Sequence, residues 1–449
     1  MLKSTEQELL YSTLEKNFPA FLQDLEALVA VPSYLTKDNY PQAAQMHQVL
    51  TVAMRIFERM GYKTYQDPDG YYGYAEIGQG STLIGVLGHL DVVPPGDLNN
   101  WETDPFQITY RDGKAYGRGT QDDKGPALTA AYAMKALLET GFKPNYRLRF
   151  IFGTDEETLW RGLNHYLLKE EKPDFGFVPD SSFPLIYAEK GVLQCTLTAK
   201  NDSGLIFSGG DAFNAVPSLM TAKKSETLCT ALDKLHYEYR TDGNTIDIIG
   251  KSMHAMNAEL GVNAIMRYLE ALELTGQHTK SGQFVLANLV GYKFAEPIFG
   301  QVTDEASGEL KCNLGKISLT AQEETLSIDI RVPVTYSKEV VVEKLTAKAA
   351  AYGFTYQEHN WLKPVYLPLD SKIIQTLLAA YQEATGDKES KPMSCGGATY
   401  ARALDNFVAF GAILPSAIET EHQPNEYMEL EDFKTAMKIY LHALANFND

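Results

Sequence analysis

Imidazole and carboxylate side chains occur in this 449-residue chain with the spacing that a metal site requires. His89 and Asp91 are two residues apart, so in an extended segment their side chains point to the same side. One nitrogen of His89 can then bind a metal ion while Asp91 orients the ring from behind. Imidazole mixed with carboxylate suits Zn²⁺ and also admits Mn²⁺ or Co²⁺. The pair by itself is equally compatible with a satisfied surface pair, so the metal site is predicted only if further ligands reach the same place.

Three further acidic residues could serve the same site. Asp122 lies in the segment GRGTQDDKGP, just before an expected helix, where backbone amides and the helix dipole favour a carboxylate. A carboxylate held there has two oxygens available to bridge two cations. Glu156 and Glu157 are adjacent and therefore cannot do the same job. We expect one of them to bind a metal ion and the other to act as general base toward the attacking water.

The elements expected around these residues would bring them together. Four short apolar runs predict buried strands at residues 83–88, 148–153, 175–178 and 407–413. His89 follows the first run, Glu156 comes shortly after the second, and Asp180 comes shortly after the third. His422 lies nine residues beyond the fourth run. Because the carboxyl ends of strands in an open α/β sheet face one crevice, these side chains should converge there.

The order of strand and helix patterns predicts the fold class. A helical pattern at 126–140 begins with Pro in its first turn and stops at Gly141. Alternating strands and helices indicate an α/β domain with a mostly parallel sheet flanked by helices. The pattern then changes, with strands expected at 192–199, 316–320 and 326–330 and helices at 218–235 and 261–274. We therefore predict a discontinuous catalytic, metal-binding domain (1–186 and 362–449) interrupted by an inserted α+β domain (187–361).

Composition limits the classes of function. The formal net charge of -18 argues against nucleic acid and anionic membranes, because both partners require a basic surface. No apolar run approaches the roughly 20 residues that span a bilayer, and the first residues are charged, so we expect a cytoplasmic protein. The four cysteines form no C-x-x-C pair, which indicates reduced thiols rather than a disulfide framework or a zinc ribbon.

Several segments resemble the successive motifs of a known enzyme family. They are LGHLDVVPPGD, WETDPF, DGKAYGRGTQDDKGP, IFGTDEET, FVPDSSFP and EHQPNEYM. The family is that of two-metal peptidases, which includes carnosinase-like enzymes, aminoacylase and succinyl-diaminopimelate desuccinylase, and the likeness is strongest to bacterial PepV-type dipeptidases. By this resemblance the metal ligands are His89, Asp122, Glu157, Asp180 and His422. It also implies that Asp122 bridges the metals, that Asp91 stands behind His89, that Glu156 is the catalytic base, and that the peptide bond after Asp122 is cis.

The resemblance extends to residues that would handle the substrate. Asn214, His254 and Arg331 match such positions in PepV-like enzymes. The planar fork of Arg331 suits a free C-terminal carboxylate, and His254 could donate to the oxyanion formed at the scissile carbonyl. Without the resemblance, Arg331 would be interpreted as a sheet-edge charge and His254 as a helix cap. Met256 and Ala258 stand where the family commonly has Ser and Pro, which leaves the shape of this loop and the substrate preference open.

A second segment, SCGGATYAR, resembles the glycine-rich turn of the family. In that turn Gly396, Gly397 and Thr399 could approach the backbone of the substrate closely. The inserted region in turn resembles the lid domain of these enzymes, and a lid that must close over the substrate would favour short peptides.

Together these features predict metal-dependent hydrolysis of dipeptides. A water activated by two bridged divalent metals, zinc before manganese or cobalt, would lose its proton to Glu156 as general base. The nearest alternative keeps this chemistry on another substrate, as an N-acyl-amino-acid deacylase or a carboxypeptidase. A peptide-binding module without turnover is disfavoured, since it would have no need of Glu156. We expect a small peptide as the only partner and a monomer, as in PepV-like enzymes with long lids, with a dimer left open.

Overall fold

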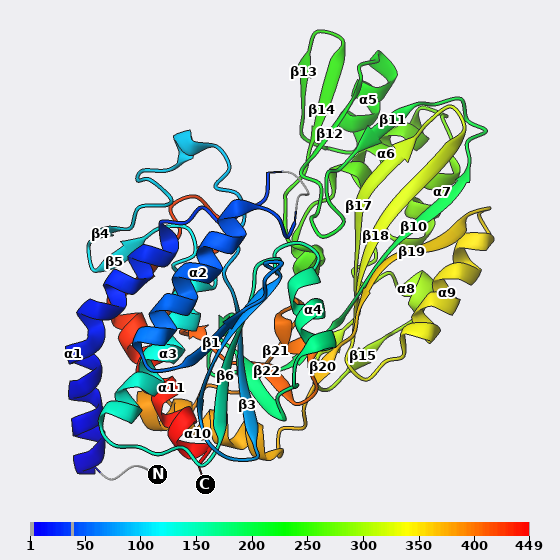
Figure 1. Cartoon of the computed structure of the whole chain (residues 1–449). Coiled ribbons are helices and arrows are strands. Elements are labelled where there is room, and N and C mark those ends of the chain that lie inside the picture. The colour runs from blue at the N-terminus through cyan, green and yellow to red at the C-terminus, as the bar shows by residue number, and fades with distance from the viewer. Residues whose placement is uncertain (1–3, 37–39, 449) are drawn as a thin grey trace. The chain divides into compact units, whose positions relative to one another are not determined.

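A computed structural model of the protein describes residues 4–36 and 40–448 (Figure 1). Contacts within the chain divide it into two units. The first unit comprises Met1–Tyr187, Leu367–Met393 and Thr399–Asp449. The second comprises Ala188–Tyr366 together with the short segment Ser394–Ala398.

The first unit is built on a sheet whose central strands are parallel (Figure 1). In spatial order these strands are β6 (Arg147–Gly153), β3 (Leu83–His89), β7 (Phe175–Val178) and β22 (Phe407–Ala409). Antiparallel neighbours continue the sheet on either side, namely β2 (Tyr72–Gly78) and β1 (Lys63–Gln66) beyond β6, and β9 (Ile186–Glu189) beyond β22. The predicted α/β class with a mostly parallel sheet is therefore confirmed.

Side chains of β6 show which helices cover each face of this sheet. Phe150 and Phe152 contact Phe57 of helix α2 (Ala44–Arg59). Arg149, the residue before Phe150, donates a hydrogen bond to Tyr166 of helix α4 (Arg161–Lys169). Because successive residues of a strand point to opposite faces, α2 and α4 lie on opposite sides of the sheet, as Figure 1 shows.

The other elements of the first unit pack around this sheet. The longer helices are α1 (Ser4–Val29), α3 (Lys124–Glu139), α10 (Lys372–Thr385) and α11 (Leu430–Asn446). The short elements are η1 (Leu98–Asn100), β4 (Thr109–Arg111), β5 (Lys114–Tyr116), β8 (Ser181–Ser182), η3 (Tyr400–Ala403), β23 (Ala412–Ile413) and β24 (Tyr427–Glu429). Strand β21 (Met393–Cys395) begins in the first unit and ends in the second. Helix α3 corresponds to the helix predicted at 126–140, and it packs against both α1 and α11. None of the helices within the described ranges is long and apolar enough to span a bilayer.

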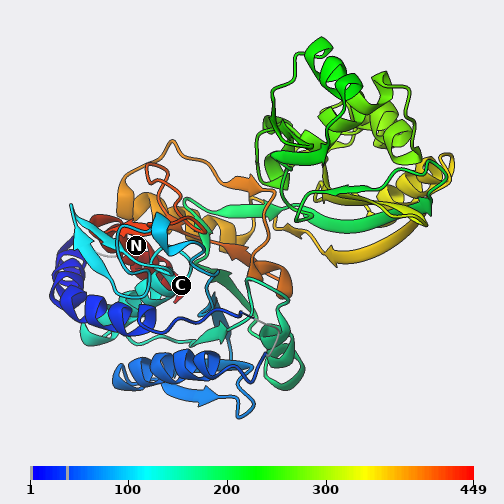
Figure 2. The same cartoon turned by 90° about the horizontal axis from the view of Figure 1, so that it is seen from above.

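The second unit combines an antiparallel sheet with helices. Its five strands in spatial order are β11 (Phe207–Gly209), β17 (Lys311–Leu319), β18 (Glu323–Val332), β10 (Gly191–Lys200) and β19 (Thr355–Leu362). Leu193, Cys195 and Leu197 of β10 alternate into a core with the helices, and Figure 2, where this unit is green to yellow, shows the helices gathered on one side of the sheet. The other elements are β12 (Leu219–Lys223), α5 (Glu226–Lys234), β13 (Tyr239–Asp242), β14 (Thr245–Ile249), η2 (Ala255–Leu260), α6 (Ala264–Leu274), α7 (Lys280–Asn288), α8 (Glu296–Phe299), β15 (Thr303–Asp304), β16 (Gly308–Glu309), α9 (Lys338–Ala350) and β20 (Val365–Tyr366).

Two predicted elements are wrong. The single strand expected at 407–413 is β22, which ends at Ala409, followed by β23, which pairs with β8 in a separate sheet. The helix expected at 218–235 is strand β12 followed by the shorter helix α5. Met220 and Ala222 are buried while the residues on either side of them are exposed, which is the period of two that a half-buried strand requires. Strand β12 pairs with β14, and Ser225 begins α5 by accepting a hydrogen bond from the amide of Leu228.

Strand β7 illustrates how the core supports the strand ends. Phe177 is fully buried, stacks on Tyr440 of α11 with ring centroids 5.5 Å apart, and meets Phe410 edge to face. Phe175, two residues earlier in the same strand, is only partly buried. The residues that follow β7, among them Asp180, therefore depend on this packing for their position.

We expect Phe177→Ala to lower the free energy of unfolding by about 3–5 kcal/mol, because the change leaves a cavity between β7 and α11. Unfolding in urea measures the loss. Phe175→Ala is the matched control and should cost less, since part of that ring already faces solvent. Equal losses for the two variants would contradict the packing described for Phe177.

Candidate metal centre

The carboxyl ends of the parallel strands bring the predicted ligands together in the first unit. His89 is the last residue of β3, Glu156 and Glu157 follow β6, and Asp180 follows β7. Asp122 lies just before helix α3, and His422 lies in the segment between β23 and β24. The side chains fall into two groups of three whose ligand atoms lie within 4.8 Å of one another: His89, Glu156 and Asp180, and Asp122, Glu157 and His422.

Asp122 joins the two groups. Its Oδ1 lies 2.9 Å from Nε2 of His89, and its Oδ2 lies 2.9 Å from Nε2 of His422. Within each group the histidine nitrogen also approaches a second carboxylate, at 3.5 Å from Asp180 Oδ2 and at 3.0 Å from Glu157 Oε1. A carboxylate with one oxygen toward each histidine has the arrangement expected of a bridge between two cations.

Two buried atoms test whether these residues fit a metal ion. Nε2 of His89 and Oδ1 of Asp122 are both buried, and neither forms a hydrogen bond with any residue that the structure describes, although they lie 2.9 Å apart. Buried polar atoms are almost always satisfied, so such a pair calls for a ligand. Atoms that each bind one zinc ion at about 2.0–2.2 Å lie about 3 Å apart. The donor set and its spacing therefore fit a divalent cation.

Acidic residues behind His89 hold it in place. The carbonyl oxygen of Asp91 lies 3.0 Å from Nδ1 of the ring, and Oδ2 of Asp91 accepts a hydrogen bond from the amide of Glu157. Asp123, which the sequence did not single out, accepts from the amide of His89 through Oδ2. The peptide bond between Asp122 and Asp123 is cis, as the resemblance implied. His89 is thus fixed from behind and leaves Nε2 facing the cluster.

The pKa values show that the cluster attracts positive charge. Burial alone would lower the pKa of His89, but the negative charges of Asp122, Asp180 and Asp91 close to the ring raise it well above its usual value. Burial likewise opposes the charged form of His422, yet hydrogen bonds to Asp122 and Glu157 raise its pKa to about 11. Without metal ions, the imidazoles therefore bind protons to balance the carboxylates.

The adjacent glutamates differ in their contacts. Burial raises the pKa of Glu157 to about 7, and its Oε1 lies 3.0 Å from His422. Burial also raises the pKa of Glu156, but no residue in the described part of the chain donates a hydrogen bond to its carboxylate. Both glutamates reach the cluster, and the assignment of one as ligand and the other as base stays a prediction.

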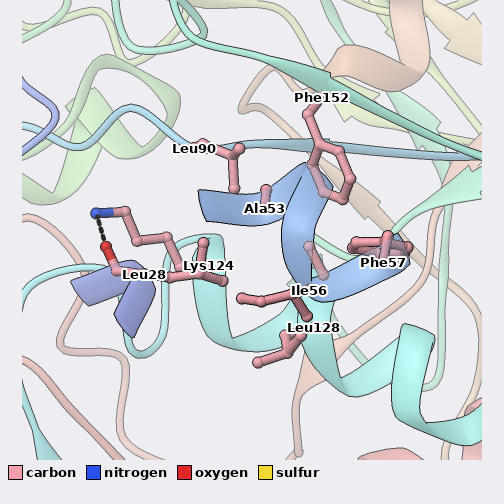
Figure 3. A pocket seen from close by; sticks show the side chains of 9 residues that line it. Leu28, Ala53, Ile56, Phe57, Leu90, Lys124, Leu128 and Phe152 are labelled. Atoms are coloured by element: carbon pink, nitrogen blue, oxygen red, sulfur yellow. Dashed lines mark hydrogen bonds between the residues drawn. The ribbon is translucent and has the colours of Figure 1, made fainter. Parts of the chain in front are cut away.

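Lys124 anchors the segment that carries Asp122. Its side chain is fully buried, and its ammonium donates hydrogen bonds to the carbonyl oxygens of Leu28 and Val31, both at 2.9 Å, at the end of α1. Figure 3 shows its stem among apolar side chains, with Leu28 and Leu90 close by. Burial lowers the pKa of Lys124 to about 7. The start of α3 is thereby tied to the end of α1, where a cation suits the open carbonyl groups.

In the second unit, the segments of Asn214 and His254 lie side by side. The carbonyl oxygen of Asn214 accepts a hydrogen bond from the amide of Ala255, and both predicted residues are exposed. Nδ1 of His254 accepts a hydrogen bond from the amide of Met256 and so caps η2. In a neutral ring the proton is then on Nε2, which makes that nitrogen a donor. The cap interpretation and the donor interpretation of His254 are therefore compatible.

Arg331 lies beside the glycine-rich turn of the same unit. Its guanidinium donates to both carboxylate oxygens of Asp329, at 2.6 and 3.1 Å, and to the carbonyl oxygen of Gly396 at 2.8 Å. A Cβ added to Gly396 would lie 2.6 Å from Cβ of Met256, so the turn packs directly on the residue that departs from the family pattern. These contacts explain why Ser394–Ala398 belongs with the second unit.

Gly397 and Thr399, the other predicted residues of the glycine-rich segment, belong to different units. The amide of Gly397 donates to Sγ of Cys395. Thr399 belongs to the first unit, where its Oγ1 accepts from the amide of Ala401 and caps η3. The structure thus pairs Asn214 with His254 and Arg331 with Gly396.

Comparison with known proteins identifies relatives of nearly the whole chain. The family model described as peptidase family M20/M25/M40 matches residues 85–446. The Bacillus subtilis (strain 168) protein named "Putative dipeptidase YtjP" is 35% identical over 419 residues, which cover 88% of this chain and 89% of that protein. The Staphylococcus haemolyticus protein named "Putative dipeptidase SH1171" is 31% identical over 455 residues, which cover 94% of this chain and 96% of that protein.

A solved structure shares the fold. The crystal structure of human carnosine dipeptidase 1 matches with a TM-score of 0.64 and covers 98% of both chains at 17% sequence identity. At this identity the likeness concerns the fold alone.

Metal binding should release protons. At pH 7 the raised pKa values keep His89 and His422 protonated in the metal-free chain, whereas a histidine that binds a metal ion must be neutral. Loading the site at pH 7 should therefore release at least two protons per chain, because Glu157, with a pKa of about 7, also loses bound protons, and the affinity for metal should rise with pH.

Calorimetric titration of Zn²⁺ into the metal-free protein, in two buffers with different ionisation enthalpies, measures this release. His422→Ala should reduce the number of protons released. The same heat in both buffers would show that the histidines bind no protons before the metal.

Proposed function

The chain belongs to the peptidase family M20/M25/M40, and on that premise we propose that it is a dipeptidase that works with two divalent metal ions, zinc being the first choice for these ligands. Membership confirms the resemblance to carnosinase-like and PepV-type peptidases. The observation that carries the proposal is the position of Asp122, with one oxygen 2.9 Å from each of two histidines. The names of the relatives from Bacillus subtilis and Staphylococcus haemolyticus favour dipeptides over other substrates of this chemistry.

The residues of the cluster would divide the chemistry among them. Two divalent cations bound here would lower the pKa of a water and polarise the scissile carbonyl. Glu156 takes a proton from the attacking water and returns it to the leaving amine nitrogen. Its carboxylate suits this role, because no described residue occupies it with a hydrogen bond. Asp91 keeps His89 oriented, and His89, Asp122, Glu157, Asp180 and His422 hold the metals.

Substrate binding is proposed for residues of the second unit. Arg331 uses three of its five N–H groups on Asp329 and Gly396, which leaves two for the C-terminal carboxylate of a dipeptide. His254 would donate from Nε2 to the oxyanion, and Asn214 would help to hold the carboxylate end. Gly396, Gly397 and Thr399 would line the substrate backbone. For these groups to act with the metals, the second unit has to serve as a lid, which limits the length of the peptide.

Glu156→Gln should lower kcat for dipeptides about 10²- to 10⁴-fold, because the amide cannot take the proton of the attacking water. The variant should keep the metal content of the parental protein, as measured by elemental analysis. The neighbouring Glu157→Gln is the matched control and should lose metal as well as activity. A Glu156→Gln variant that turns over at the parental rate would exclude Glu156 as the base.

Three compounds test which free ends the enzyme requires in its substrate: alanyl-alanine, its C-terminal amide and N-acetylalanine. We expect the free dipeptide to have the highest kcat/KM, about 10- to 100-fold above the amide, because a charge-assisted hydrogen bond to the carboxylate is lost in the amide. N-acetylalanine should be the poorest substrate. Preference for N-acetylalanine would favour the deacylase alternative.

The variant Arg331→Lys sharpens this test. If Arg331 binds the substrate carboxylate, the preference for the free dipeptide over its amide should narrow in the variant. If Arg331 serves only to hold Asp329 and the turn at Gly396, kcat/KM should fall by the same factor for the free dipeptide and for its amide.

A further inference from the structure

Two segments about 300 residues apart in sequence carry the ligands at the bridge of the metal centre. We call residues 117–122 the Asp122 loop and residues 418–427 the His422 loop. Asp122 Oδ2 and His422 Nε2 lie 2.9 Å apart, so the relative position of the two loops sets the geometry of this ligand pair. Neither loop belongs to the central sheet that positions the other ligands.

Glu426 of the His422 loop binds the backbone of the Asp122 loop. Its side chain is fully buried. Its Oε1 accepts hydrogen bonds from the amides of Gly119, Gln121 and Asp122, at 3.0, 2.9 and 3.2 Å. Its Oε2 accepts from Nη1 of Arg118 at 2.7 Å. The loop that carries Asp122 is therefore wrapped around one carboxylate from the other loop.

Gln121 of the Asp122 loop binds the backbone of the His422 loop in return. Its Oε1 accepts from the amides of Thr420 and Glu421, at 2.6 and 3.0 Å. Its Nε2 donates to the carbonyl oxygens of Ile418 and Tyr427, at 3.0 and 3.3 Å. The side chain is 4% exposed. The segment that carries His422 is thus held at both ends by one amide.

The chemistry of each side chain matches its task. A carboxylate only accepts, which suits the four donors around Glu426, whereas a primary amide both donates and accepts, which suits the mixed partners of Gln121. An exchange of Glu for Gln, or of Gln for Glu, keeps the shape of the side chain but removes some of the matched donor and acceptor pairs. Such exchanges therefore probe the hydrogen bonds with little change in packing.

We propose that Gln121 and Glu426 are positioning residues for the metal ion that Asp122, Glu157 and His422 would hold, acting as a reciprocal clamp between the two loops. The inference rests on the proposed metal centre. It predicts that loss of either side chain weakens the ion at His422 more than the ion at His89. The second ion shares Asp122, but its other ligands, His89 and Asp180, lie at the ends of sheet strands and keep their positions. Loss of such supporting contacts typically lowers metal affinity about 10- to 100-fold.

The first test uses Gln121→Glu in the full-length zinc-loaded protein. The carboxylate cannot donate to Ile418 and Tyr427, so the His422 loop loses two hydrogen bonds. Its added negative charge would by itself bind a cation more tightly, so weaker binding can only come from misplaced ligands. Gln423→Glu is the matched control, because it adds the same charge at an exposed position next to His422.

Glu426→Gln provides the second test, with Glu419→Gln as its control at an exposed position of the same loop. This variant removes a negative charge, the opposite change to Gln121→Glu. A common effect of the two variants on metal binding therefore identifies positioning rather than charge. Because Glu426→Gln also leaves Arg118 without its buried anion, Gln121→Glu remains the deciding variant if the second protein folds poorly.

The measurement is the zinc retained per chain after dialysis against increasing concentrations of a chelator, determined by elemental analysis. The melting temperature of each metal-free protein is recorded beside it. We expect the parental protein and both controls to hold two zinc ions. In the clamp variants one of the two ions should leave at a chelator concentration about 10- to 100-fold lower.

Each outcome decides between the possibilities. If Gln121→Glu keeps both ions like the parental protein and only melts at a lower temperature, the residue is structural and the clamp is refuted, while the proposed function stands. If the parental protein holds no zinc, manganese or cobalt, the proposed metal centre and the clamp fall together. Selective loss of one ion in the clamp variants, with both retained in the controls, supports the inference.

Discussion

The position of one buried carboxylate, that of Asp122, sets the requirements for the rest of the structure. Each of its oxygens faces a histidine 2.9 Å away, and Asp123, Glu156, Glu157 and further acidic groups lie around it. Charges buried in this way are costly unless cations compensate them. In the metal-free chain protons on the histidines supply that compensation, and divalent ions would do so more fully. Part of the net charge of -18 is concentrated here for that reason.

The fold meets this requirement with two kinds of support. The parallel strands of the first unit place His89 and Asp180 at or just beyond their carboxyl ends, and buried side chains such as Phe177 pack these strands against helix α11. Asp122 and His422 lie on loops, which have no such support of their own. Hydrogen bonds through Gln121 and Glu426, and the anchoring of Lys124 at the end of α1, give these loops a defined position.

Two residues of the second unit, Arg331 and His254, make structural hydrogen bonds and can still donate others to a substrate. Arg331 is buried against Asp329 and the carbonyl oxygen of Gly396, yet its guanidinium has two N–H groups beyond those contacts. His254 caps η2 through Nδ1, which places the ring proton on Nε2. A side chain that is already held by the protein loses less conformational entropy when it binds a substrate, so these contacts favour a binding role.

The sequence by itself determined the features that depend on neighbouring residues. The apolar runs before His89, Glu156 and Asp180 predicted three buried strands, because burial of a strand leaves a local pattern in the sequence. The position of these three residues after the runs predicted that their side chains converge. Only the tertiary structure decided which oxygen of Asp122 faces which histidine, and that residues 219–223 pair as a strand instead of continuing a helix. It alone revealed the contacts of Gln121 and Glu426, since hydrogen bonds between residues about 300 positions apart leave no periodic signal in the chain.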